Sequence, residues 1–254
     1  MVNYIFAEAS MIWSLILLLL FTTGNSTSPL GMLVGLVLAT RPVILDTWWS
    51  NLVQNYPPLS LIGVIIPLIT LVVYWVHGLL HLIVDVTRWP PLYKYKIQPN
   101  KHLDISTIPH LFYTLIKVQL MVFLPVSYMF AYISVNTKYG LWTEDISLPT
   151  NRSIVLHLLG YALVDEIFFY SNHRIAHHKS LYRHVHKIHH QWTAPIALAS
   201  DYCHPLEHLL VNVLPNISYG IIVGSDPFTF LLWWLLVYLG SQTNHSGYRF
   251  SHEI

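Results

Sequence analysis

Charged residues are scarce in this sequence, and their scarcity indicates the class of protein. Only 10% of the 254 residues are Asp, Glu, Lys or Arg, whereas 54% are hydrophobic. With a mean hydropathy of +0.50, this composition is typical of an integral membrane protein. The net charge is +1 with neutral histidines, so no basic surface for a nucleic acid is indicated. We expect a membrane as partner and no nucleic acid.

Cysteine is almost absent as well. Cys203 is the single cysteine, which excludes a disulfide within the chain and a metal site built from several thiolates. The sequence also has no HExxH motif, the signature of a zinc protease, and no glycine-rich phosphate loop. Any metal site must therefore use nitrogen and oxygen ligands.

Long uncharged runs predict the membrane segments of an all-α, polytopic helical bundle. The first run, residues 9–40, is broken at 22–28 by Gly, Ser, Thr and Asn, which predicts a turn between two short segments. No Lys or Arg precedes it, so we expect residues 1–23 to be retained, with a cleaved signal peptide as the alternative. Further runs cover residues 59–84, 118–137 and 153–170, and a last pair, 209–225 and 227–239, flanks Asp226 as a re-entrant or spanning hairpin.

The distribution of basic residues orients these segments. Lys and Arg favour the cytosolic side, which places the basic loop 88–101 and the basic stretch 173–190 there. The two runs between them cross the membrane out and back, and the last pair returns residues 241–254 to the cytosol. We expect N-terminal membrane segments over 1–84 and a domain with a cytosolic, histidine-rich cap over 85–254.

The histidine-rich stretch is the feature that calls for chemistry. Residues 173–190 hold seven of the sixteen histidines, in the order H-R-I-A-H-H-K-S-L-Y-R-H-V-H-K-I-H-H. His173 and His177 are four residues apart, so a helix that continues the 153–170 segment places both on one face. The HxxHH spacing of the next group gives a second shared face, formed by His186, His189 and His190.

Five imidazoles on two neighbouring helices predict a metal site. Imidazole binds iron, copper and zinc well, and five ligands exceed the four that close a structural zinc site. A two-metal site is the natural interpretation. The competing interpretation is a solvated or lipid-headgroup-binding patch, but such a patch does not favour this spacing. His178 and His184 lie off the shared faces and are expected to be solvated or to support the ligands.

Other residues are expected to complete or support the site. His245 returns to the cytosolic side and is the sixth ligand that we predict. A carboxylate commonly accepts the second N–H of a metal-bound imidazole, a role that suits Asp165, Glu166 and Glu207. His204 is as consistent with support as with ligation, because Pro205 interrupts the local helix. We expect structural roles for His77, His81 and His208.

The motifs taken together resemble the fatty acid hydroxylase / sterol desaturase superfamily. The residues that carry the likeness are, in order, H-R-I-A-H, L-Y-R-H-V-H-K-I-H-H, T-A-P, Y-C-H-P-L-E-H and N-H-S-G-Y, with K-Y-K-I-Q-P-N-K at 94–101. They are most similar to sterol C4-methyl oxidase-like and fatty acid hydroxylase domain-containing proteins, over roughly residues 85–250.

This resemblance implies an enzyme of the endoplasmic-reticulum membrane with two histidine-bound iron ions. It implies hydroxylation of a sterol methyl group or a fatty acyl chain with O2 and NAD(P)H-derived electrons, passed on by cytochrome b5 or its reductase. Desaturation begins with the same hydrogen abstraction and stays open. The metal ligands that carry over by position are His173, His177, His186, His189, His190 and His245.

The chain departs from the family's pattern at its C-terminal end. Arg249 stands where many relatives have histidine, and the family's last HxxHH box does not follow His252. We therefore expect a C-terminally incomplete domain, and the alternative function is a non-catalytic membrane protein that binds a metal or a lipid. A metal transporter is a third hypothesis, but transport predicts polar groups within several spans.

Overall fold

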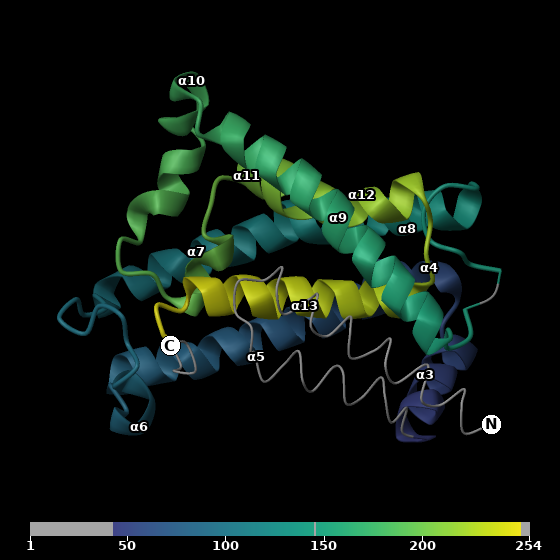
Figure 1. Ribbon diagram of the computed structural model, residues 1–254, viewed down its shortest axis with the longest axis horizontal. Helices are drawn as coiled ribbons and strands as arrows, with labels where there is room; N and C mark the ends of the chain where they lie inside the picture. Colours follow the sequence, from purple (N-terminus) through teal and green to yellow (C-terminus); the bar gives the residue numbers. More distant parts are fainter. Residues whose placement is uncertain (1–42, 145, 250–254) are drawn as a thin grey trace.

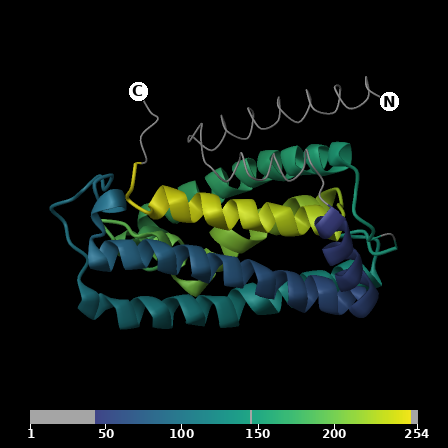
Figure 2. The same cartoon turned by 90° about the horizontal axis from the view of Figure 1, so that it is seen from below.

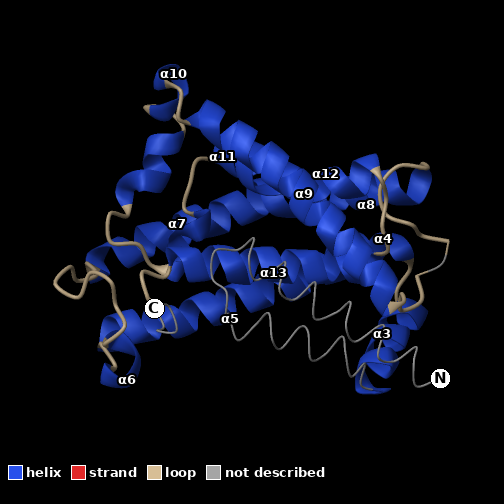
Figure 3. Ribbon diagram, viewed as in Figure 1, coloured by secondary structure: helices blue, strands red, loops and turns tan. Residues whose placement is uncertain are grey.

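A computed structural model describes residues 43–144 and 146–249. Within this part the chain is helical and forms no sheet, with one isolated bridge between Lys96 and Tyr248 (Figure 3). The expected all-α architecture is confirmed. The predicted segments and turn within residues 1–40 lie outside the described residues.

The described helices follow one another through short connections. The longer ones are α3 (Val43–Asn55), α5 (Ile66–Thr87), α7 (Ile108–Val118), α8 (Leu124–Asn136), α9 (Asn151–Ala176), α12 (Leu214–Ile222) and α13 (Pro227–His245). The short α-helical turns are α4 (Pro58–Ser60), α6 (Pro90–Tyr93), α10 (Lys179–Tyr182) and α11 (Pro205–Glu207). Segments of 3₁₀ helix are η2 (Ile105–Thr107), η4 (His186–Gln191) and η5 (Ala197–Asp201), and the π-helical segments are η1 (Leu61–Ile65), η3 (Gln119–Phe123) and η6 (His208–Val213).

Three continuous helical runs among the described residues are long and apolar enough to cross a membrane: Pro58–Thr87, Ile105–Asn136 and Asn151–Ala176. Large apolar side chains stay exposed along them, for example Val72 (61%) and Leu80 (59%). An apolar face left outside a bundle of this length is suited to lipid. The protein is a membrane protein, as its composition predicted.

The second of these runs begins earlier than the sequence indicated. The uncharged run predicts a segment that starts at residue 118, but the helical run starts at Ile105. Leu111, Leu115 and Val118 are buried on one face of α7, whereas Lys117 lies off that face beside exposed Ile116. An amphipathic face of this kind carries charge without ending the helix.

The last pair of apolar runs forms α12 and α13. Neither helix is among the three candidate spans of the described chain. Instead α13 packs along α5 and crosses α9 (Figure 1), and it lies between these two helices when the molecule is turned (Figure 2). The hairpin therefore serves as the centre of the bundle, and its far end carries His245.

Prolines shape three of the helical runs, two of them candidate membrane spans. Each π-helical segment is followed by a proline at the second position of the next α-helix: Pro67 after η1, Pro125 after η3 and Pro215 after η6. Proline has no N–H, and its ring collides with the carbonyl four residues earlier. A wider π turn at that point relieves the collision without ending the helix, which explains why the run through Pro67 stays helical.

The contact between α5 and α13 contains a buried polar seam. The side chain of Gln242 donates to the Tyr74 carbonyl at 2.9 Å, and its oxygen lies 2.7 Å from Nδ1 of His77. The hydroxyl of Tyr74 donates to the Leu198 carbonyl at 2.9 Å. Gly78 lies in the same contact, where a Cβ would overlap Leu198 and the Gln242 amide.

Adding that Cβ is expected to destabilise the bundle. Overpacking of a well-filled contact costs about 1–3 kcal/mol, so Gly78→Ala should lower the free energy of unfolding by that amount in detergent. Gly240→Ala is the matched control, because a Cβ at Gly240 meets no atom of residues 43–144 or 146–249 within 4 Å and alanine favours the helix. Equal unfolding midpoints for the two variants would contradict this description of the α5–α13 contact.

Candidate metal centre

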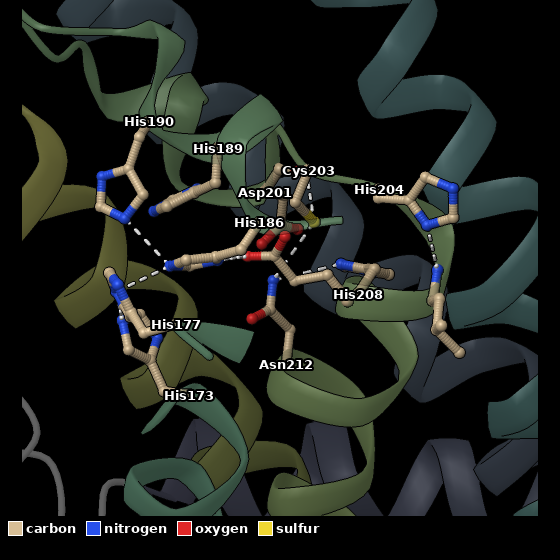
Figure 4. A network of polar contacts seen from close by, with 12 residues as sticks. His173, His177, His186, His189, His190, Asp201, Cys203, His204, His208 and Asn212 are labelled. Atoms are coloured by element: carbon tan, nitrogen blue, oxygen red, sulfur yellow. Dashed lines mark hydrogen bonds and ion pairs between the residues drawn. The ribbon is translucent and has the colours of Figure 1, made fainter. Parts of the chain in front are cut away.

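Six histidines converge at the C-terminal ends of α9 and α13, the side that we predict to face the cytosol. His186 lies in the middle: its Nε2 is 2.9 Å from Nε2 of His177 and 2.9 Å from Nε2 of His190. His177 and His173 face each other with Nε2 atoms 3.1 Å apart. Figure 4 shows five of these rings gathered on one side of the polar network. The sixth, His245, places its Nε2 3.3 Å from that of His189.

The two halves of the cluster come from different local structures. α9 continues from the membrane segment to Ala176, and His177 is the first residue beyond it, so His173 and His177 share the predicted face. The HxxHH group is not α-helical as expected, because η4 is a 3₁₀ helix. With three residues per turn, side chains three apart eclipse one another. His186 and His189 therefore stack, with ring centroids 5.7 Å apart.

Contacts behind the rings fix which nitrogen faces the cluster. Nδ1 of His245 lies 2.8 Å from the carbonyl oxygen of Ser241, which accepts only. Nδ1 must therefore carry the proton, and Nε2 of neutral His245 presents a lone pair to the cluster. A bare Nε2 is what a metal ion requires of an imidazole.

Glu207 plays the corresponding part for His186. Its Oε1 lies 2.6 Å from Nδ1 of His186, and both side chains are buried. Burial raises the pKa of Glu207 to about 8. Burial, and then the neighbouring imidazoles, lower the pKa of His186 to about 3. The pair therefore shares one proton, and a cation at Nε2 would favour that proton on Nδ1 with a carboxylate opposite.

His189 is also poised as a neutral ligand. Burial first, and His245 next, lower the pKa of His189 to about 4. The Nε2 atoms of His173, His177, His186 and His190 follow one another at 2.9–3.1 Å, a spacing that suits ligands of a common cation. The chemistry of the donor set thus fits a metal that accepts many imidazoles.

The cluster divides into two groups. Ligand atoms of His173, His177 and His186 all lie within 4.8 Å of one another, and His190 joins them through His186. His189 pairs instead with His245. The geometry therefore offers one position with three or four imidazoles and a second with two, in keeping with the predicted two-metal site.

The other predicted supporting residues lie elsewhere. Asp165 is half-buried and Glu166 exposed on α9, and no contact with a cluster histidine is seen for either within the described chain. His204 caps α11, where its Nδ1 accepts the Leu206 N–H at 3.1 Å. It lies on the far side of the network from the five gathered rings (Figure 4).

The histidines given structural roles by the sequence have structural contacts. His208 is buried, with Nδ1 3.3 Å from the Asn212 amide. His77 bonds Gln242, and Nδ1 of His81 lies 3.1 Å from the His77 carbonyl.

A buried ion pair that the sequence analysis missed holds the end of the bundle that carries His245. The Lys96 ammonium donates to Asp85 at 2.6 Å and to the Ser246 carbonyl at 3.0 Å. The hydroxyl of Tyr248 donates to the same Asp85 oxygen at 2.8 Å. Lys96 enters the sequence analysis only as part of K-Y-K-I-Q-P-N-K, and Asp85 has no role there. The sequence signal for a buried partner was Asp85 itself, a charged residue directly after the uncharged run 59–84.

Removing the Glu207 carboxylate is expected to weaken metal binding. Partners of this kind affect metal affinity by about 10–100-fold, so Glu207→Gln should raise the dissociation constant of iron by that factor. Equilibrium dialysis with metal analysis measures it. Glu166→Gln is the control, because Glu166 is exposed on α9. Equal affinities of the two variants would remove Glu207 from the site.

Comparison with known proteins gives consistent matches. The family model for fatty acid hydroxylase matches residues 158–254. Fatty acid hydroxylase domain-containing protein 2 of Macaca fascicularis is 32% identical over 181 residues, 69% of this chain and 53% of the relative. The very-long-chain aldehyde decarbonylase GL1-11 of Oryza sativa subsp. indica is 32% identical over 206 residues, 81% of this chain and 75% of the relative.

Methylsterol monooxygenase 1 of Gallus gallus is 31% identical over 163 residues, 63% of this chain and 53% of the relative. The chain spans about half the length of the first relatives that it matches. No solved structure matches it.

Proposed function

The chain belongs to the fatty acid hydroxylase / sterol desaturase superfamily, and on that premise we propose that it is a membrane-bound, iron- and O2-dependent oxygenase of a lipid C–H bond. The observation that supports this most is the convergence of six imidazoles, one of which holds its Nδ1 proton on a backbone carbonyl. The coarser conclusion, a lipid-processing oxidoreductase of a membrane, follows from the family itself.

The ligands in this proposal are the six convergent histidines. His173, His177, His186 and His190 hold one iron ion, and His189 and His245 contribute to a second. Iron suits a nitrogen-rich set better than calcium or magnesium, which prefer oxygen. Zinc alone does not need so many imidazoles, because four ligands complete its structural site.

The chain's own residues prepare this centre. When bound, iron would supply the redox chemistry that activates O2 and removes hydrogen from an unactivated C–H bond. The Ser241 carbonyl holds the proton of His245 on Nδ1. With a cation at Nε2 of His186, Glu207 would hold that ring's proton on Nδ1 in the same way. Neutral imidazoles leave the metal's positive charge uncompensated. The spanning helices keep an apolar lipid beside the site.

The relatives' names cover several lipid classes. One relative is named for fatty acid hydroxylation, another for a methylsterol and a third for a very-long-chain aldehyde. For this chain we propose hydroxylation of a fatty acyl chain or a sterol methyl group. The electrons come from NAD(P)H through cytochrome b5 or its reductase, and the site faces the cytosol from the endoplasmic-reticulum membrane.

The test is reconstitution of the purified chain with iron. Iron content is measured first, and oxygenated product is then sought from fatty acyl and sterol substrates with O2 and a reductant. Product that depends on iron, O2 and reductant supports the proposal. Full iron loading with no product from either lipid class sinks it in favour of a non-catalytic metal- or lipid-binding protein.

A further inference from the structure

A cavity of about 250 Å³ lies beside η4, outside the histidine cluster. It is bounded by α7 on one side and by the chain around α11 on the other. Among the described residues its lining contains no Asp or Glu and consists of His110, Tyr113, Thr114, Lys117, Val118, Ile188, Gln191, Tyr202, Cys203, His204 and Pro205. A cavity with a lysine and no carboxylate is suited to an anion.

Hydrogen bonds around the cavity leave donor groups on two of its lining side chains. Because Nδ1 of His204 accepts the Leu206 N–H at 3.1 Å, neutral His204 carries its proton on Nε2, where it is a donor. The oxygen of the Gln191 amide accepts from the Tyr202 hydroxyl at 3.0 Å, which leaves the Gln191 NH₂ to donate. Neither contact supplies the cavity with negative charge.

Lys117 is the charged member of this lining. It belongs to the candidate span Ile105–Asn136, about 18 Å along the helix from Ile105 at 1.5 Å per residue. No ion pair to Lys117 occurs among residues 43–144 and 146–249. A lysine at such a place in a spanning helix is costly unless a partner compensates it, and the partner is then functional.

The cavity is one short helix away from the metal centre. In a 3₁₀ helix, residues three apart lie on the same edge. In η4, His186 and His189 occupy one edge and reach the cluster, whereas Ile188 and Gln191 occupy another and line the cavity. A molecule anchored in the cavity is thus held next to the cluster and against the spanning run Ile105–Asn136.

We propose that this cavity binds the oxyanion head group of a lipid, a carboxylate or a phosphate, and so selects an acid-headed lipid as the substrate. Val118, Ile188 and Pro205 supply apolar surface for the start of its tail. That the bound lipid is the substrate rests on the proposed oxygenase function. Head-group binding itself does not. A neutral sterol lacks the charge that Lys117 would recognise.

Binding to the purified, iron-free chain in neutral detergent tests the proposal. The probes are a long-chain fatty acid, the fatty alcohol of the same chain length and a lysophosphatidic acid, at a pH at which the acids are ionised. One or both acids should bind at least about tenfold more tightly than the alcohol, as expected of charge-assisted hydrogen bonds. Which acid is preferred distinguishes a carboxylate from a phosphate head group.

Variants separate the cavity from general membrane electrostatics. Lys117→Met should bring acid and alcohol to about equal affinity, whereas Lys117→Arg should keep the preference. His204→Asn keeps a side chain suited to capping α11 but removes the Nε2 donor. It should weaken the binding of the acid and leave the binding of the alcohol unchanged. Lys138→Met is the control, because Lys138 is an exposed lysine beyond the far end of the same helical run.

Three results would overturn the proposal. They are equal binding of acid and alcohol by the unaltered chain, an acid preference that survives Lys117→Met, and binding of inorganic phosphate as tight as that of either lipid acid. The second would mean that Lys117 only extends to the membrane surface. Product formation is measured separately on iron-loaded protein, so selective binding without product would refute the oxygenase and leave the head-group site standing.

Discussion

Replacing His186 by Asn is expected to abolish product formation and to remove most of the bound iron. His186 touches His177 and His190 at 2.9 Å and is fully buried, so no neighbouring ring can take its place. Loss of a ligand should exceed the roughly 10–100-fold loss of metal affinity that accompanies loss of an outer hydrogen-bond partner. Iron content by mass spectrometry and product yield measure the two effects.

The control for this experiment is His184→Asn, in the same stretch. His184 is exposed and has no ring contact with the cluster among the described residues. Asn at 186 also leaves Glu207 with a poorer partner, at a cost of about 1–3 kcal/mol, so thermal unfolding of both iron-free variants is recorded first. Iron retained by a folded His186→Asn protein would place the metal elsewhere.

Lys96→Met is expected to cause the largest loss of stability, about 3–5 kcal/mol. The substitution strands Asp85, whose side chain is only 2% exposed, without its ion-pair partner, and breaking a buried pair has a cost of that size. It also removes the bond to the Ser246 carbonyl, next to His245. Denaturant unfolding in detergent gives the free energy.

A double variant shows whether the stranded charge is the cause. Lys96→Met with Asp85→Asn should recover part of the loss, because a neutral amide is less costly to bury than a carboxylate. Lys94→Met, two residues earlier in the loop and exposed, should leave stability within about 0.5 kcal/mol. Similar losses for the Lys94 and Lys96 variants would contradict the role given to the pair.

The histidine cluster was predictable because its spacing is local. HxxxH at 173–177 needs only a helix to bring two rings together, and α9 provides it. The sequence offered three carboxylates as acceptors for the second N–H of a metal-bound imidazole, and Glu207 was one of them. Geometry distinguishes Glu207 from Asp165 and Glu166, since the distance across 21 residues depends on how α11 packs and not on sequence spacing. The assignment of the six rings as ligands stays a prediction.

Long-range burial was the part that spacing did not reveal. A lysine in a basic loop is ordinarily solvated, and nothing in K-Y-K-I-Q-P-N-K distinguishes exposed Lys94 from buried Lys96. The pairing depends on Tyr248 and Ser246, about 150 residues away. The start of α7 was missed for a related reason, because charge on one face of a helix lowers the average hydropathy of the whole segment.

The π turn at η6 changes the directions in which side chains before and after it point around the helix axis. An extra residue in a turn rotates everything beyond it by about 100° relative to a regular α-helix. Glu207 lies immediately before η6, and Pro215 lies two residues after its last residue, Val213. The direction in which this carboxylate points, relative to α12 embedded in the bundle, is thus set by a proline two turns away. Pro215 would be expected to break a helix. Here it is accommodated by a π turn, and the rotation of that turn contributes to the direction of the Glu207 carboxylate toward His186.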